Sequence, residues 1–203
     1  MNILAAVTPQ AWVDAACEGW RELLVDHANC EKKAASSALA MIFAYPQDQA
    51  LTTTLSRLAR EELRHFEQVS QMMRRLQVEY VRQRPGRYAA GLRAAVRQHE
   101  PVRKLDLMCA HALIEARSCE RFRLLAARLP APLAAFYESL RHCEARHFEL
   151  YVRLAQLAAD AADPSQAQTR LAELAAVEAE LATLPDEQLR FHSGPPRLGS
   201  ASN

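Results

Sequence analysis

The sequence predicts an all-α protein whose core is a bundle of four long helices with an internal two-fold repeat. Ala, Leu, Arg and Glu dominate its 203 residues, and only five residues are Gly. These abundant residues favour helices, whereas the β-branched and aromatic residues that strands prefer are scarce. Apolar residues recur at helical spacing over long stretches that Pro and Gly separate. Finally, a pair of motifs occurs once in each half of the chain, which indicates the repeat.

The first half of the chain is expected to hold one short and two long helices. The short helix should start at Pro9, because proline suits the first helical position. The first long helix should span about residues 19–44. Asp48 is placed to cap the second long helix, which the Pro- and Gly-containing segment 83–87 should break.

The second half is expected to begin with a short basic helix over residues 88–98, which crosses over to the second helical hairpin. Bundles of this kind need one long connection between their hairpins. The third long helix should run over 101–128, and the fourth should follow Pro132 up to about Asp160. An acidic helix is expected over 164–182.

Residues 1–192 are therefore expected to form a single helical domain. The remainder, 193–203, is rich in Gly, Pro and Ser, and this composition predicts a disordered tail. The start of the chain lacks a basic segment followed by a long apolar run, and no stretch of about 18 apolar residues exists. The five cysteines form no C-x-x-C pair, so we expect reduced, mostly buried thiols and a cytoplasmic protein.

The repeated motif has the pattern E-x-R-H-F-E. It begins at Glu62 and again at Glu144. Upstream of each copy, the shorter pattern H-A-x-x-E occurs, first at His27 and then at His111. Because both patterns recur with almost the same separation, we infer that one helical hairpin was duplicated.

Each half thus provides one Glu followed by a Glu-x-x-His pair. Residues three apart share one face of a helix, so the Glu and the His of a pair can bind one metal ion. Apolar neighbours at helical spacing predict that all four carboxylates face the core, which disfavours the alternative of surface pairs on a plain bundle. An isolated buried carboxylate is costly, and two divalent cations would neutralise four of them. The expected ligands are Glu31, Glu62, His65, Glu115, Glu144 and His147.

This ligand set favours iron or manganese over structural zinc, because it contains carboxylates and imidazoles without thiolates. It is also the set of ferritin-like dimetal carboxylate proteins. His27 and His111 each precede a ligand Glu by one helical turn, so they are candidates to hydrogen-bond it. Glu67 and Glu149, at the ends of the two motifs, are expected to face solvent.

The longer sequences around the motifs, DHANCEKKAASSAL and LAREELRHFEQV, resemble the MiaE family of tRNA hydroxylases. The resemblance covers the chain except for its tail. It implies a ferritin-like di-iron monooxygenase that uses O2 to hydroxylate the isopentenyl group of 2-methylthio-isopentenyl-adenosine beside the tRNA anticodon. In the family pattern Glu31 and Glu115 are terminal ligands, Glu62 and Glu144 bridge the irons, and each iron has one His ligand, His65 or His147.

A basic segment supports RNA as a partner. The formal net charge is only +1, yet residues 72–104 contain nine Arg or Lys against two acids. Such a segment can follow a phosphate backbone, and Tyr80 or Tyr88 could stack on an unpaired loop base. We expect the tRNA anticodon arm to contact Arg74, Arg75, Arg82, Arg84 and Arg87, and the wider segment also holds Arg93, Arg97, Arg103 and Lys104.

The reaction implied by the resemblance needs two external electrons. The chain lacks the C-x-x-C pairs of a rubredoxin-type site and a Gly-rich dinucleotide loop, so a separate ferredoxin-like or flavoprotein donor is expected. Three alternatives stay open from the residues alone. They are a ferritin-like iron-oxidising or storage protein, a quinone-type di-iron hydroxylase, and a metal-free helical RNA-binding or scaffold protein.

Overall fold

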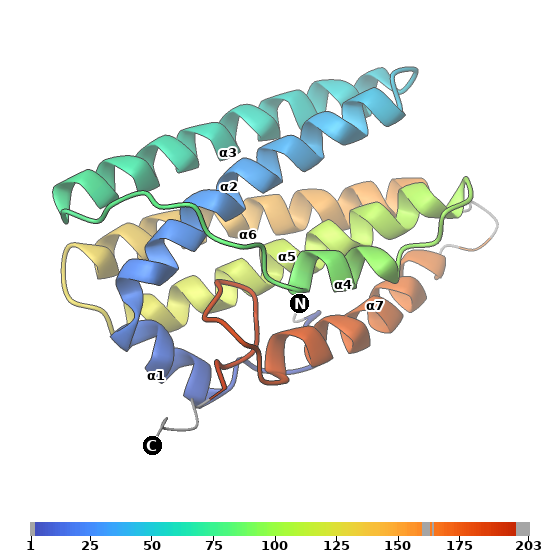
Figure 1. Cartoon of the computed structure of the whole chain (residues 1–203). Coiled ribbons are helices and arrows are strands. Elements are labelled where there is room, and N and C mark those ends of the chain that lie inside the picture. Colours follow the sequence, from blue (N-terminus) through green and yellow to red (C-terminus); the bar gives the residue numbers. More distant parts are fainter. Residues whose placement is uncertain (1–2, 160–162, 164, 198–203) are drawn as a thin grey trace. The chain divides into compact units, whose positions relative to one another are not determined.

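A computed structural model of the chain describes residues 3–159, 163 and 165–197. Within these residues it contains seven helices and no strand, apart from one isolated backbone bridge between Asp186 and Pro196 (Figure 1). The predicted all-α class is therefore confirmed. The chain divides into two compact units, one formed by residues 19–84 and the other by 1–18 with 85–203. None of the helices in the described ranges is long and apolar enough to cross a membrane.

The 19–84 unit is a helical hairpin of α2 (Trp20–Ala44) and α3 (Gln49–Arg75), which lie side by side in Figure 1. The predicted cap of α3 is confirmed, because Asp48 Oδ1 accepts a hydrogen bond from the backbone N–H of Leu51 at 3.0 Å. This bond satisfies one of the N–H groups that the first helical turn leaves without an intrahelical acceptor. The hairpin buries apolar side chains from both helices, including Leu24, Ala28, Leu55, Leu58 and Val69.

Helix α3 ends well before the segment 83–87 that was expected to break it. Gln77 adopts a left-handed conformation with φ of 54°. The N–H of Val78 donates to Met73 O at 2.9 Å, and the N–H of Gln77 donates to Arg74 O at 3.2 Å. These two bonds define a Schellman C-cap. The motif usually contains Gly at the left-handed position, so the Gln in this chain gave no sequence signal for the helix end.

The second unit contains the other five helices, all of which occur close to their expected positions. Helix α4 is shorter than expected, because it ends at Ala94 and not near residue 98. Helices α5 and α6 form the second long hairpin, with α7 against α5 (Figure 1). The bounds are α1 Gln10–Glu18, α4 Tyr88–Ala94, α5 Val102–Ala126, α6 Leu133–Ala158 and α7 Gln166–Thr183.

A buried ionic network joins α7 to α4 and α5. Arg117 of α5 is fully buried and donates two hydrogen bonds of 2.8 Å to Glu178 of α7. Tyr88 of α4 donates a third hydrogen bond to Glu178 at 2.9 Å. Burial is the larger cause, and the nearby Glu178 carboxylate the second, of a Tyr88 pKa well above its usual value. A buried charge is tolerated only when it is paired and hydrogen-bonded. The acidic helix is therefore part of the core of its unit.

The expected disordered tail does not start at residue 193, because the chain is packed and hydrogen-bonded beyond Gln188. Ser193 is fully buried, and its Oγ accepts the N–H of Arg190 at 3.1 Å. Two backbone bonds then fix the chain next to Asp186, whose N–H donates to Pro195 O and whose O accepts from the N–H of Arg197. A Cβ atom at Gly194 would clash with Leu184 O, so the segment needs Gly at this position to pack onto the protein. Residues 198–203 lie outside the described residues, and the single domain over 1–192 stays a prediction.

Candidate metal centre

The 19–84 unit brings three predicted ligands together on its two helices. Glu31 lies on α2, and Glu62 and His65 lie on α3, each with at most 5% of its surface exposed. His65 Nδ1 is 3.3 Å from Glu62 Oε2 and 3.7 Å from Glu31 Oε2. Both carboxylates therefore approach the same imidazole nitrogen, as expected for groups that bind one cation. We name these three residues the first half-site, after the role that the motifs predict for them.

His27 supports the first half-site from one helical turn away. Its Nε2 lies 2.5 Å from Glu31 Oε1, and both side chains are buried. The imidazole donates to the carboxylate, so it holds Glu31 in one orientation and supplies a hydrogen bond where water is excluded. The structure thus contains the contact between His27 and Glu31 that the H-A-x-x-E pattern predicts.

The second half-site lies on α5 and α6 of the other unit. Glu144 and His147 are buried neighbours on one face of α6, with His147 Nδ1 3.5 Å from Glu144 Oε2. Glu115 of α5 is also buried, at 4% exposure. All four predicted ligand carboxylates and both imidazoles are thus in the protein interior, which excludes the alternative of surface Glu-x-x-His pairs.

His111 does not repeat the role of His27, although both occur in the same H-A-x-x-E pattern. Its Nδ1 donates to Leu107 O at 2.7 Å, and its ring stacks on Tyr151 of α6 with centroids 5.0 Å apart. Burial lowers the pKa of His111, which favours the neutral imidazole. His111 donates to a backbone carbonyl, whereas the sequence predicts a hydrogen bond to Glu115. The two copies of the H-A-x-x-E motif therefore place their His residues in different environments.

Replacing His27 with Ala is expected to weaken metal binding at this site by about 10- to 100-fold, because partners that orient a ligand typically contribute this much. Iron titration of the apo-protein measures the affinity directly. His111→Ala is the matched control, because it removes an equivalent imidazole one turn before Glu115 without removing a bond to that carboxylate. Equal losses of affinity in both variants would mean that His27 acts only through packing.

The residues beside the ligands point elsewhere, as helical geometry requires. Glu67 and Glu149 are exposed, as predicted. Arg64 is exposed and lies 3.7 Å from Glu61. Burial raises the pKa of Cys30 well above its usual value, so this thiol stays protonated beside Glu31 and does not act as a thiolate ligand. All five cysteines are free thiols, but only Cys109 is fully buried, so the expectation of mostly buried thiols was too strong.

The donor chemistry fits a metal site. Glu62, His65, Glu144 and His147 are all buried and carry atoms of the kind that hold a metal ion. Buried carboxylates are costly unless a cation or a proton neutralises them, and oxygen and imidazole donors suit iron. The Glu…Glu-x-x-His pattern of each unit is compatible with a di-iron site.

The helices and these buried ligand sets define a protein of the ferritin-like class. A solved structure described as protein 43 with aldehyde deformylating oxygenase activity, from Synechococcus, matches with a TM-score of 0.89 and 39% identity. The match covers 96% of this chain and 98% of that one. The ferritin-like fold predicted from the sequence is confirmed.

The family follows from whole-chain similarity. The family described as tRNA-(MS[2]IO[6]A)-hydroxylase (MiaE) matches residues 1–193. A relative from Pseudomonas putida KT2440 is 48% identical, with 98% of this chain and 95% of the relative covered. A second, from Salmonella typhimurium LT2, is 36% identical over 98% of this chain and 90% of its own. Both are named tRNA 2-(methylsulfanyl)-N(6)-isopentenyladenosine(37) hydroxylase. The chain belongs to the MiaE family of tRNA hydroxylases.

The structure shows which residues of the basic segment are exposed. Arg74, Arg75, Arg82 and Arg84 are exposed in the 19–84 unit. Arg87 belongs to the other unit, where its Nε lies 3.0 Å from Asp186 Oδ2 and its Nη2 donates to Leu184 O at 2.8 Å. This guanidinium therefore holds the C-terminal segment, which the sequence did not indicate.

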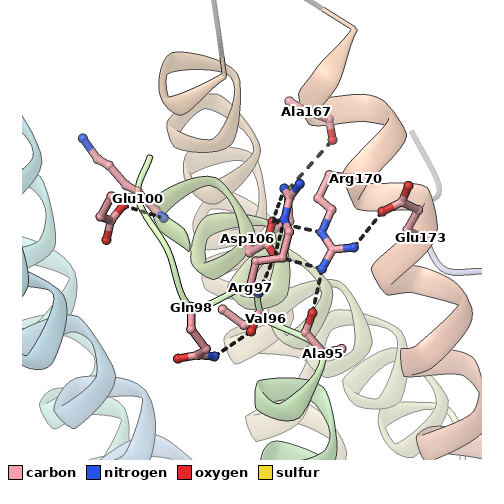
Figure 2. Close-up of polar contacts among 11 residues, drawn as sticks. Ala95, Val96, Arg97, Gln98, Glu100, Asp106, Ala167, Arg170 and Glu173 are labelled. Atoms are coloured by element: carbon pink, nitrogen blue, oxygen red, sulfur yellow. Dashed lines mark hydrogen bonds and ion pairs between the residues drawn. The ribbon is translucent and has the colours of Figure 1, made fainter. Parts of the chain in front are cut away.

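Arg97 and Tyr88, which also lie in the basic segment, bind other parts of the protein. Arg97 pairs with fully buried Asp106, which Arg170 of α7 contacts as well (Figure 2). Burial alone would raise the pKa of Asp106, but the hydrogen bonds from Arg97 and Arg170 outweigh it and lower the pKa. Tyr88 is 4% exposed, so its ring is not available to stack on a base.

Proposed function

We propose that this enzyme hydroxylates the isopentenyl group of 2-methylthio-N6-isopentenyladenosine at position 37, next to the tRNA anticodon. One observation carries the proposal. A member of the MiaE family, similar over nearly its whole length to two relatives named for this reaction, keeps a buried Glu…Glu-x-x-His set in each unit. Since tRNA is the substrate, the proposed location is the cytoplasm.

We propose that the two half-sites together hold two iron ions. Glu31, Glu62 and His65 would supply one half of the ligands, and the other half would come from Glu115, Glu144 and His147. Four carboxylates carry a charge that two ferrous ions balance. When bound, the iron pair supplies the two-electron chemistry with O2 that inserts one oxygen atom into a C–H bond. The second oxygen atom leaves as water, with two protons and two electrons from an external donor.

The chain's own residues position the ligands, exclude water from the site and orient the carboxylates. Ligands on the long helices α2, α3, α5 and α6 are held more precisely than ligands on loops. Their burial excludes bulk water, which would otherwise compete for the site. His27 keeps the Glu31 carboxylate oriented. A ferredoxin-like protein or a flavoprotein is the proposed electron donor.

The docking surface for the anticodon arm is proposed to include the exposed arginines Arg74, Arg75, Arg82 and Arg84. Guanidinium groups bind phosphates with two parallel hydrogen bonds and release condensed counterions. Arg87 is not included in this proposed surface, because Asp186 and two backbone carbonyls already bind its guanidinium group.

Nucleoside analysis of cellular tRNA tests the function. Cells without the gene should contain only the unhydroxylated modified adenosine, and cells with it should contain the form that is heavier by one oxygen atom. Unchanged nucleosides in both strains would refute the assignment. The similar Synechococcus protein is named for an activity on aldehydes. Turnover of an aldehyde without turnover of tRNA would favour that second candidate.

A further inference from the structure

Tyr80 is an exposed aromatic residue whose side chain is fixed in place. Its surface is 44% exposed, although it lies in the irregular segment after α3. Its hydroxyl donates a 2.9 Å hydrogen bond to Asn29 Oδ1 on α2. The segment itself is also attached to α2, because Gln83 Nε2 donates to Glu22 O at 3.0 Å. The ring is thus held against the helix without being buried by it.

A cation and a second ring complete the surroundings of Tyr80. Lys32 Nζ lies 4.9 Å from the centroid of the Tyr80 ring and 5.4 Å from that of Phe66. The two rings are 6.2 Å apart and tilted by 50°. The ammonium group is attracted to the faces of aromatic rings, so it restrains both. Lys32 is adjacent to Glu31 in sequence, but it is exposed while Glu31 is buried.

Proteins that bind single-stranded RNA combine these two elements. Aromatic rings stack on unpaired bases, and nearby cations bind the flanking phosphates. The exposed Arg82 and Arg84 follow Tyr80 in the same segment. A ring that is already fixed loses little conformational freedom when a base stacks on it, so binding is stronger.

We propose that Tyr80, assisted by Lys32, stacks on an unpaired base of the anticodon loop that flanks the modified adenosine. This inference rests on the proposed function and deepens it. The sequence left Tyr80 and Tyr88 as equal candidates for stacking, and the structure separates them. Tyr88 is buried and donates to Glu178, whereas Tyr80 presents its ring to solvent.

The test measures how tightly an isolated anticodon stem-loop carrying the modified adenosine binds to the iron-loaded protein, by fluorescence anisotropy. Tyr80→Ala should weaken binding by roughly 5- to 100-fold, the loss typical of one stacked base. Tyr80→Phe should keep most of the affinity, because the ring stays next to Lys32 and Phe66. The slope of affinity against salt concentration should stay the same in Tyr80→Ala, since stacking releases no counterions.

Phe43→Ala is the matched control. Phe43 is an aromatic residue of the same unit with 84% exposure, and it lies 14 residues beyond Asn29 on α2. That separation is about 21 Å along the helix. The control should bind the stem-loop like wild type, and iron content and melting temperature should be equal in all variants.

The outcomes separate the stacking inference from the proposed function. If wild type binds and hydroxylates the stem-loop while Tyr80→Ala does so equally well, the stacking inference is wrong and the function stands. A weaker Tyr80→Ala complex with a salt slope reduced by about one would also overturn it, because that change indicates a lost phosphate contact. Should wild-type protein with bound iron neither bind nor modify the stem-loop, the proposed function fails and the inference fails with it.

Discussion

Glu144→Ala is expected to lower the iron content from two ions per chain to at most one and to abolish hydroxylation. Glu144 is the proposed bridging ligand of the second half-site, and its loss also leaves His147 without its 3.5 Å carboxylate neighbour. Glu62→Ala should have the same effect on the first half-site. Elemental analysis of the reconstituted protein gives the iron content, and nucleoside mass spectrometry gives the activity.

The sequence offers a close control for each substitution. Glu149 and Glu67 end the same motifs that Glu144 and Glu62 begin, but both are exposed. Glu149→Ala and Glu67→Ala should therefore keep both irons and full activity. The proposed ligand set would be wrong if Glu144→Ala retained two irons and turned over tRNA like Glu149→Ala.

Charge reversal at Arg75 and Arg82 should raise the apparent KM for tRNA by at least about tenfold at low salt. Both residues are exposed in the 19–84 unit and are proposed to bind phosphates. The slope of log affinity against log salt concentration should become smaller in magnitude by about two, because each lost phosphate contact reduces it by about one. Iron content should not change, because neither residue belongs to the ligand set.

A second double variant separates this local effect from the change in net charge. Arg57→Glu with Arg60→Glu alters the charge by the same amount at exposed positions nearer the start of α3. It should shift KM much less than the first pair. If the two pairs behave alike, tRNA is attracted by overall charge and the 74–84 segment is not the docking surface.

The ligands and helices were predictable because local periodicity determines them. Spacing of three residues places Glu62 beside His65 on one face, and apolar neighbours predict that this face is buried. The cap at Asp48 was predictable for the same reason, since its partner Leu51 is three residues away. All six predicted ligands are buried as the motifs required.

The departures arose where a residue's partner is distant in sequence or has an unusual residue type. From the sequence, Tyr88 and Arg87 were candidates to contact RNA. In the structure Tyr88 binds Glu178 of α7, and Arg87 binds Asp186 of the segment after it. Charge counts along the chain cannot reveal such pairs. The left-handed Gln77 ended α3 without the Gly that normally marks such a position. Identical H-A-x-x-E patterns also concealed different environments for their two His residues.

We expect this chain to use two bound irons and O2 to hydroxylate a modified tRNA base. The most direct measurement supplies purified, iron-reconstituted protein with tRNA that carries the unhydroxylated base, a chemical reductant and isotopically labelled O2. One oxygen atom should be added per modified adenosine, and that atom should come from O2. Unaltered tRNA from protein with both irons bound, or product oxygen that comes from water, would contradict this reaction.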